Sequence, residues 1–424
     1  MNGFGMKTES ALWKILLIFI CLRPFLSEAA FLTVGCWYVF PLLSFSLAFF
    51  ILYTKKFLSP WYINLWPLLY IISILISMLA AGYTSWTLIE FYFLIPNIVI
   101  YYIAVRINPV QQKQLIRAMV VTAFIICLYS IYQYFFGLKH TFEYLSQTQR
   151  SGWMGEILKG KRVFATFVSP NIFASYVLMM LFTSIGLLIE KKGAGKIIYW
   201  IGTIAMALSL LYTKSFGGLL TLGATLLLSL PYILPYFIEK KHARRSAFLI
   251  ILIVAVFLGI SSSLFFGRLS QLFDLQGPHN SVTQRFHYWK ASIDMLRHSP
   301  FSGIGWRRFG EFYISFRPQS ANVSHYSHNV FLQTLVETGP LGLAALVALI
   351  TTFLINGLRV LGRDAEKRAL RMGLFYGGCA FLIHNLIDLS FYFSQASYFW
   401  WLIAGLFTNY RLAIRSGKEQ GRQY

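Results

Sequence analysis

Long apolar runs, each of about twenty residues and separated by short polar connections, dominate the pattern along the chain. A run of that length crosses the hydrocarbon core of a bilayer as one helix. The pattern therefore predicts an all-α polytopic membrane protein, with about twelve transmembrane helices in a single membrane domain over 1–424. The predicted spans are 12–28, 31–53, 61–81, 86–105, 115–136, 170–189, 197–213, 216–238, 246–266, 335–358, 372–391 and 396–411.

The polar connections alternate in charge. Lysine and arginine pairs recur on every second connection and in the C-terminal tail, for example at Lys55-Lys56, at Lys240-Lys241 and at Arg415 and Lys418. Short loops that carry this excess stay on the cytoplasmic side. We therefore expect both termini to be cytoplasmic in the bacterial cytoplasmic (inner) membrane.

Two long connections fall on the opposite side, 137–169 and 267–334, and we interpret both as extracytoplasmic loops. The second is predicted to be partly helical, because apolar residues recur at helical spacing over 283–298 and Ser299-Pro300 ends that segment. A further helix is expected from His328 to Gly339, with Pro340 placed to start the next one.

Composition sharpens this picture. The chain is 57% hydrophobic and only 12% charged, whereas soluble domains carry about 25% charged residues. The net charge of +22 would suit a nucleic-acid partner, but the basic residues are dispersed in pairs between apolar runs rather than gathered on one soluble face. We therefore expect contacts with membrane lipids and no nucleic-acid binding.

The predicted outer loops are rich in arginine. Guanidinium is always charged and binds phosphate groups through two parallel donors, so such a cluster above a membrane suits a lipid-linked phosphate or diphosphate. Contacts with lipid headgroups or acidic neighbours are the alternative for each of them. The residues are Arg150, Arg162, Arg268, Arg285, Arg297, Arg307, Arg308 and Arg317.

Most of the histidines lie in the long 267–334 loop: His279, His287, His298, His325 and His328. A neutral imidazole is a natural general base near neutral pH. The spacing His325-x-x-His328 also allows a metal site, but no thiol or carboxylate accompanies the pair at ligand spacing. A third possibility for His328 is a structural role at the start of a helix.

Some ionisable residues fall within predicted spans, where charge is costly and often functional. His384 and Asp388 are expected one helical turn apart near the outer end of the eleventh span, as a structural pair or as part of the site. Arg23 and Glu90 are expected in the outer halves of their spans, where they could pair with each other.

The stretch 328–342 resembles the signature of O-antigen ligases. That signature is His, then Asn, Ser or Gln, nine residues, Gly, two residues, and Gly, Thr or Tyr; His328, Asn329, Gly339 and Gly342 satisfy every defined position. Two further stretches are similar to segments of the same superfamily: one runs from Arg285 to Trp289 and continues to Pro300, Gly303 and Gly305, and the other runs from Arg162 to Asn171.

One place departs from the family pattern. The segment Thr213-Lys214-Ser215-Phe216-Gly217 stands where relatives often have Ser-Arg-Gly, so Phe216 replaces the arginine and Lys214 is the candidate to supply its charge.

The resemblance implies a GT-C-like membrane glycosyltransferase. It would transfer a glycan from undecaprenyl diphosphate to an acceptor hydroxyl on the outer face of the membrane, without a metal or cofactor and with inversion. His328 would be the base; Arg162, Arg285 and, more weakly, Lys214 would bind the diphosphate. Asn329, His384 and Asp388 are possible supporting residues, and Trp153, Trp306 and Tyr326 could stack on sugar rings.

The acceptor stays open between a lipid A-core, a second glycan and a protein, so a polysaccharide polymerase and a protein O-oligosaccharyltransferase are alternatives within the superfamily. A secondary transporter is the rival class. Transporters place polar sites near the bilayer midplane, often between paired repeats, whereas here the polar residues concentrate outside the spans and no repeat is visible.

Overall fold

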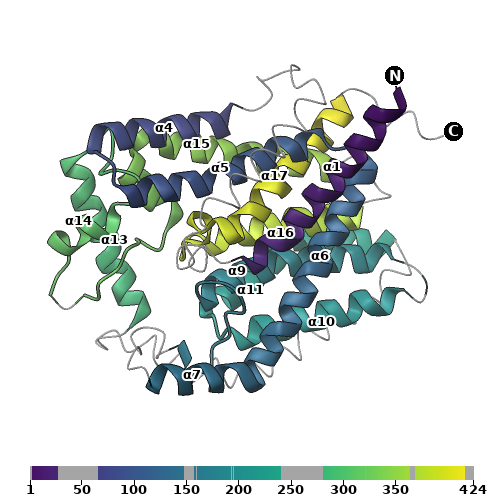
Figure 1. Cartoon of the computed structure of the whole chain (residues 1–424), viewed down its shortest axis with the longest axis horizontal. Helices are drawn as coiled ribbons and strands as arrows, with labels where there is room; N and C mark the ends of the chain where they lie inside the picture. The colour runs from purple at the N-terminus through teal and green to yellow at the C-terminus, as the bar shows by residue number, and fades with distance from the viewer. Residues whose placement is uncertain are drawn as a thin grey trace.

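A computed structural model describes residues 2–26, 65–147, 157–158, 160–191, 193, 195–239, 280–319, 321–362 and 368–415. The regular structure of these residues is entirely helical, which confirms the all-α prediction. The beginning of α1 and the end of α17 lie at one end of the helical bundle, and α13 and α14 lie at the other (Figure 1). We refer to the latter as the α13 end.

The helices are α1 (Asn2–Leu22), α4 (Trp66–Ala81), α5 (Ser85–Arg106), α6 (Pro109–Tyr132), α7 (Leu138–Gln147), α9 (Pro170–Glu190), α10 (Lys196–Tyr212), α11 (Phe216–Glu239), α13 (Ser281–His298), α14 (Phe309–Phe316), α15 (Val330–Leu361), α16 (Arg368–His384) and α17 (Ser394–Arg415). A π-helical turn, Gln133–Gly137, joins α6 to α7, and short 3-10 turns cover Arg23–Phe25 and Ser390–Tyr392.

The predicted spans can be compared with these helices. The spans 31–53 and 246–266 lie outside the described residues, and each of the others falls on a helix. Among the described residues, five helices are long and apolar enough to cross a membrane: Ser85–Arg106, Pro109–Thr141, Pro170–Glu190, Phe216–Ile233 and Val330–Leu361. The protein is thus a helical multi-pass membrane protein, while the number twelve and the GT-C-like arrangement stay predictions.

One predicted span ends too late. The apolar run 372–391 was expected to be helical throughout, but α16 ends at His384. The Asn385 side chain stops the helix: its Nδ2 donates to the carbonyl of Phe381 at 2.7 Å, and its Oδ1 accepts the N–H of Phe391 at 2.7 Å. Terminal carbonyls need such partners, so a polar residue inside an apolar run redirects the chain here.

The centre of the bundle is packed at backbone distance. A Cβ added to Gly373 of α16 would lie 2.4 Å from the carbonyl oxygen of Phe182, and one added to Gly377 would lie 2.5 Å from that of Met179, both on α9. Small residues four apart let two membrane helices approach closely. On α17, Trp400 and Trp401 are fully buried.

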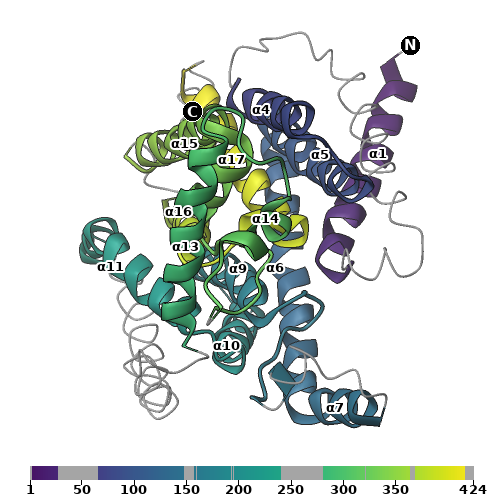
Figure 2. The same ribbon diagram turned by 90° about the vertical axis from the view of Figure 1, so that its left-hand side faces the viewer.

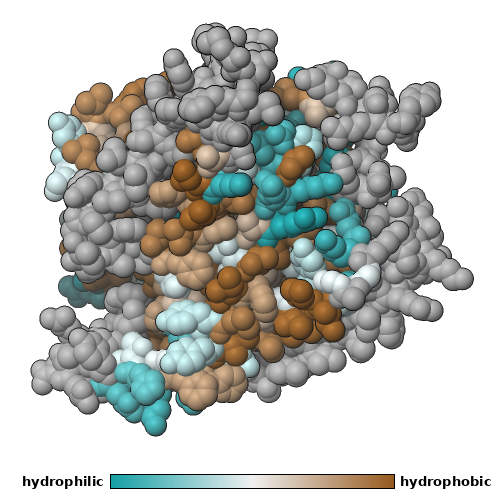
Figure 3. Space-filling view, turned by 45° about the vertical axis from the view of Figure 1, so that its right-hand side comes forward, coloured by the Kyte–Doolittle hydropathy of each residue, from teal (hydrophilic) through white to brown (hydrophobic). Residues whose placement is uncertain are grey.

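Large aliphatic side chains point outward from the same bundle. Leu79 on α4, Ile197 on α10 and Leu227 on α11 are 75%, 64% and 68% exposed. Apolar residues also cover much of the coloured surface in Figure 3, with hydrophilic residues in a patch at the upper right and another at the lower left of that view. Exposed leucine and isoleucine on several helices are what a lipid environment requires.

The α13 end has a small hydrophobic core of its own, formed by Tyr288, Met295, Ile304, Tyr313 and Val336, among others. Figure 2 views the molecule from this end, with α13 and α14 toward the viewer. The predicted helix 283–298 is confirmed as α13. The predicted break at Gly339 is also confirmed, because its φ of +70° and ψ of −173° interrupt α15 before Pro340.

Candidate active site

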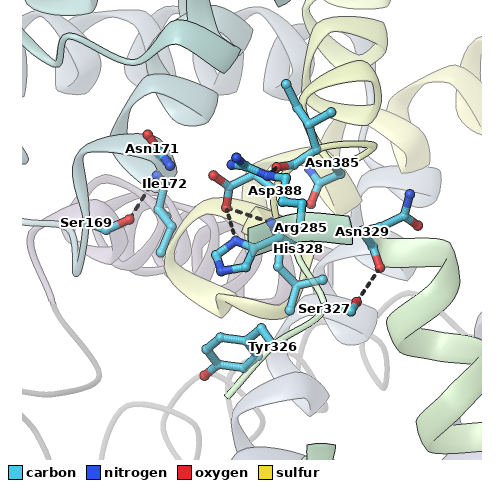
Figure 4. Close-up of polar contacts among 12 residues, drawn as sticks. Ser169, Asn171, Ile172, Arg285, Tyr326, Ser327, His328, Asn329, Asn385 and Asp388 are labelled. Atoms are coloured by element: carbon cyan, nitrogen blue, oxygen red, sulfur yellow. Dashed lines mark hydrogen bonds and ion pairs between the residues drawn. The ribbon is translucent and has the colours of Figure 1, made fainter. Parts of the chain in front are cut away.

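His328 stands two residues before α15 in a left-handed backbone conformation, with φ of +55°. Residues without a glycine's freedom seldom adopt this conformation, and such positions often mark functional sites. The imidazole Nδ1 lies 3.9 Å from Oδ1 of Asp388 (Figure 4). Nδ1 is buried although the side chain is 31% exposed, so the exposed part of the ring lies away from Asp388.

Asn329 attaches the beginning of α15 to the segment that follows α16. Its Oδ1 caps the helix by accepting the N–H of Leu332 at 3.0 Å, and its Nδ2 donates to the carbonyl of Leu386 at 3.0 Å. The N–H of Val330 donates to the carbonyl of Asn385 at 3.0 Å. These bonds hold Asp388 beside His328.

His384 and Asp388 do not share a helical turn as expected, because Asp388 lies beyond the end of α16. Oδ1 of Asp388 accepts the N–H of Leu389 at 2.7 Å. His384 is fully buried. The carboxylate nevertheless interacts electrostatically with both His384 and His328.

Arg285 reaches the same segment from α13. Its Nε donates to the carbonyl of Ile387 at 2.8 Å, and its Nη1 donates to the carbonyl of Ser281 at 2.9 Å. Figure 4 shows Arg285, His328 and Asp388 together. We call these three residues the His328 half of the site.

The surroundings of His328 favour its neutral form. Burial lowers the pKa of His328 below the ordinary histidine value; the negative charge of Asp388 opposes this change, and the positive charge of Arg285 adds to it. A neutral imidazole can accept a proton at neutral pH. The carboxylate facing Nδ1 would favour the tautomer in which the lone pair is on Nε2.

Arg162, Lys214 and Asn171 form a second group, which we call the Arg162 half. Arg162 donates from Nε to the carbonyl of Thr213 at 3.0 Å and from Nη2 to Oδ1 of Asn171 at 2.9 Å. Nζ of Lys214 donates to the carbonyl of Gly160 at 2.8 Å. The two predicted cations thus lie on touching loops, although Lys214 replaces an arginine of the family pattern.

The beginning of α11 connects the two halves. Ser215 donates from Oγ to Oδ1 of Asn171 at 3.0 Å. Two residues later, a Cβ added to Gly217 would lie 2.9 Å from Cδ1 of Ile387 and 3.4 Å from Nε2 of His384. Figure 4 shows Asn171 and Ser169 on one side of the view and His328 with Asp388 at its centre.

Several expectations are corrected. Trp306 is only 2% exposed and stacks on Tyr392, so it cannot stack on a sugar. Glu90 forms an ion pair with Arg307 at 2.6 Å. That contact gives Arg307 and Glu90 each a buried partner, and the expected pairing of Glu90 with Arg23 stays a prediction. Trp153, Arg150, Arg268 and His279 lie outside the described residues.

The inward face of the first turns of α15 is partly polar. Phe331, Leu332 and Leu335 are only partly buried. The fully buried side chains of this turn include the polar Gln333 and Glu337. Their spacing of four residues within an apolar run was the signal available in the sequence.

Gln133 was missed as well. It begins the π-helical turn and is 5% exposed, and its Oε1 accepts the N–H groups of Phe164 and Ala165 at 3.0 and 2.8 Å. It thereby fixes the loop that carries Arg162. Such π-helical turns occur frequently at functional sites.

The arrangement contains cations and a candidate base, with no obvious metal centre. Within the described residues, no group of three or more His, Cys, Asp or Glu side chains is placed to hold a metal ion. His325, the other histidine of the proposed pair, is exposed and lies against Gly310. Metal independence stays a prediction for experiment.

The fold and site define a multi-pass helical membrane protein with a histidine and arginine site at one end of its bundle. Residues 201–347 match a family model described as O-Antigen ligase. This range contains Lys214, Arg285, His328 and Asn329, and it excludes Arg162, His384 and Asp388. The chain is also 24% identical over 302 residues to the exopolysaccharide production protein ExoQ of Rhizobium meliloti (strain 1021).

That alignment covers 67% of this chain and 63% of the relative, so the chain spans less than two thirds of the relative's length. Both matches support the conclusion that the motif at His328 predicted. Both are similarities to the O-antigen ligase and polymerase superfamily, in line with the resemblance of the segment that begins at His328.

Proposed function

We propose that the protein is an O-antigen ligase-like glycosyltransferase that transfers a glycan from undecaprenyl diphosphate to an acceptor hydroxyl. The reaction would take place on the outer face of the cytoplasmic membrane, where the α13 end would lie. The observation that carries the proposal is the grouping of His328, Asp388 and Arg285 at the start of α15.

In the proposed reaction, the acceptor oxygen attacks the anomeric carbon while the bond from that carbon to the diphosphate breaks. The hydroxyl proton passes to His328, whose protonated form Asp388 would stabilise. The electron pair of the broken bond leaves with the diphosphate, and direct displacement inverts the anomeric centre. Each atom and charge is accounted for without a cofactor.

The leaving diphosphate gains negative charge as the bond breaks. Cations fixed before the reaction stabilise such charge without reorganisation. Arg285 is held by the backbone carbonyls of Ser281 and Ile387. Arg162 is held by the backbone carbonyl of Thr213 and by the side-chain oxygen of Asn171. Both guanidinium groups are therefore oriented by neighbours, with Lys214 as an additional charge.

The test uses purified protein in lipid nanodiscs with a radiolabelled glycan on undecaprenyl diphosphate. Transfer to an added acceptor is expected from the wild type and should be lost in His328→Ala. Release of the glycan from the donor in the absence of an acceptor would contradict the proposal and favour hydrolysis. Uptake of free sugar into sealed vesicles without glycan transfer would contradict it and favour transport.

The likeness to a protein of exopolysaccharide production favours a second candidate, a polysaccharide polymerase. The two differ in the acceptor. Parallel reactions with a lipid A-core, with a second lipid-linked glycan and with a serine-containing peptide would separate ligase, polymerase and protein O-oligosaccharyltransferase by the mass of the product.

A further inference from the structure

The backbone of Ser327, the residue before His328, is hydrogen-bonded on both sides. Oε1 of Gln333 accepts the N–H of Ser327 at 2.6 Å. The carbonyl of Ser327 accepts a bond from Nε1 of Trp289, on α13, at 3.0 Å. Both backbone polar groups of the residue before His328 are therefore fixed by buried or half-buried side chains.

A second buried side chain sets the orientation of Gln333. Its Nε2 donates to Oε1 of Glu337 at 2.8 Å, and the same oxygen accepts the N–H of Phe309 at 3.3 Å. Gln333 and Glu337 are both fully buried. Because the amide nitrogen must face Glu337, the amide oxygen must face Ser327, and the amide cannot flip without losing both bonds.

This order matters for His328 because its backbone has φ of +55°. Such a conformation persists only where neighbouring contacts over-determine it. If the backbone of Ser327 were released, His328 could relax to the common negative-φ region and its ring would turn away from Asp388.

We propose that Gln333, oriented by Glu337, is a positioning residue that holds the backbone of Ser327, the residue before His328, and so aims the imidazole at Asp388 and the acceptor hydroxyl. This inference rests on the proposed function, since it assigns a task to the base. It goes beyond the matched motif, whose defined positions do not include residue 333.

The test uses two substitutions of Gln333 and a double variant in which the residues at positions 333 and 337 are exchanged. Gln333→Met keeps the length of the side chain but removes both hydrogen bonds. Gln333→Glu keeps the acceptor for Ser327 but places a carboxylate against Glu337. The double variant Gln333→Glu/Glu337→Gln restores a donor between the two positions, an acceptor for Ser327 and an acceptor for Phe309.

We expect kcat to fall about 10- to 100-fold in Gln333→Met, because small displacements of a catalytic group have effects of that size. The KM for the lipid-linked donor should change little, since Arg162 lies on the loop before α9 and Arg285 lies on α13. The single Gln333→Glu variant should lose kcat similarly, and the double variant should recover most of it.

Thr334→Val is the matched control. Thr334 is the next residue on α15 and equally buried, but its hydroxyl contacts Tyr392. It should keep wild-type kcat. Trp289→Phe offers an independent test from the other side of Ser327 and should also lower kcat rather than raise the donor KM.

Wild-type kcat in Gln333→Met and Trp289→Phe would overturn the proposal, and so would a double variant as poor as the single Gln333→Glu. A variant of position 333 that fails to accumulate leaves Trp289→Phe to decide the question. Undiminished transfer by His328→Ala would instead overturn the role of the base itself, which is a separate result.

Discussion

The His328 half and the Arg162 half of the site are built in different ways. In the His328 half, both neighbours of the histidine are bound, Ser327 through its backbone N–H and Asn329 through its side chain, while Nδ1 faces Asp388 at 3.9 Å without a hydrogen bond. In the Arg162 half, the side-chain donors of Arg162 and Lys214 are themselves bound to backbone carbonyls and to Asn171.

The difference matches what each half is proposed to do. A base must exchange a proton, so its ring needs an accessible nitrogen and only its backbone can be fixed. A group that stabilises charge works best when its own dipoles are already oriented. A buried glutamine serves each half: Gln333 accepts the amide of Ser327, and Gln133 accepts those of Phe164 and Ala165.

The substitution His328→Ala tests most directly whether the His328 half supplies the general base. A positioned general base contributes about 10²- to 10⁴-fold to rate, so turnover should fall by that factor while donor binding and protein amount stay normal. His325→Ala, three residues away and exposed, is the control and should cost little. Near-normal turnover by His328→Ala would make this histidine a structural residue at the start of α15.

Arg285→Lys should have the next largest effect, a loss of about 10²-fold in kcat. Lysine keeps the charge but cannot bind the carbonyls of Ile387 and Ser281 and a phosphate at once. Arg297→Lys is the control, because Arg297 is exposed and pairs with Asp294 in its own helix turn. Equal turnover of both variants would contradict a role of Arg285 in binding the diphosphate and would favour a contact with lipid headgroups.

Asp388→Asn should lower turnover by about tenfold or more and change its pH dependence. His328 must be neutral to accept a proton, so the rate falls as pH drops through its pKa, which burial lowers below the ordinary histidine value in the wild type. Removing the negative charge that opposes this lowering depresses the pKa further. The acidic limb of the kcat/KM profile should therefore move to lower pH; a shift to higher pH would contradict the role of Asp388.

Gln133→Leu should act on the other half. Without an acceptor for the amides of Phe164 and Ala165, the loop that carries Arg162 loses its anchor, and the KM for the donor should rise about three- to tenfold. Gln133→Glu keeps the acceptor and should stay close to wild type. If Gln133→Leu lowered kcat and left KM unchanged, the division of labour between the halves would be wrong.

Some features of the fold and of the site could be predicted because they leave a pattern in the sequence. The apolar runs, the helix over 283–298 and the break at Gly339 are periodic or local signals, and the structure confirms them. The grouping of His328 with Arg285 was expected from a sequence signature. The end of α16 at His384 was missed because one side chain, Asn385, overrides a run of apolar residues.

Contacts between distant segments leave no such signal. The pairing of Arg307 with Glu90 joins residues far apart in the chain, and an arginine in an arginine-rich loop gives no hint that aromatic rings surround it. Gln333 and Glu337 are polar residues in an apolar helix, so their burial could have been suspected. Their partners, Ser327 and Phe309, depend on how α14 packs on α15.

The smallest expected effect is that of removing metal ions. Both halves supply fixed positive charge, through Arg285 on one side and Arg162 and Lys214 on the other, so the leaving diphosphate has cationic partners without a divalent ion. A Mg²⁺ on a diphosphate is normally held by carboxylates, and the carboxylate of the site, Asp388, instead faces His328 and binds the amide of Leu389. Turnover measured after dialysis against EDTA should therefore equal that of the untreated protein, and added Mg²⁺ or Mn²⁺ should not raise it. Activity abolished by EDTA and restored by one of these ions would mean that the arginines alone do not neutralise the diphosphate, and would return attention to a metal near His325 and His328.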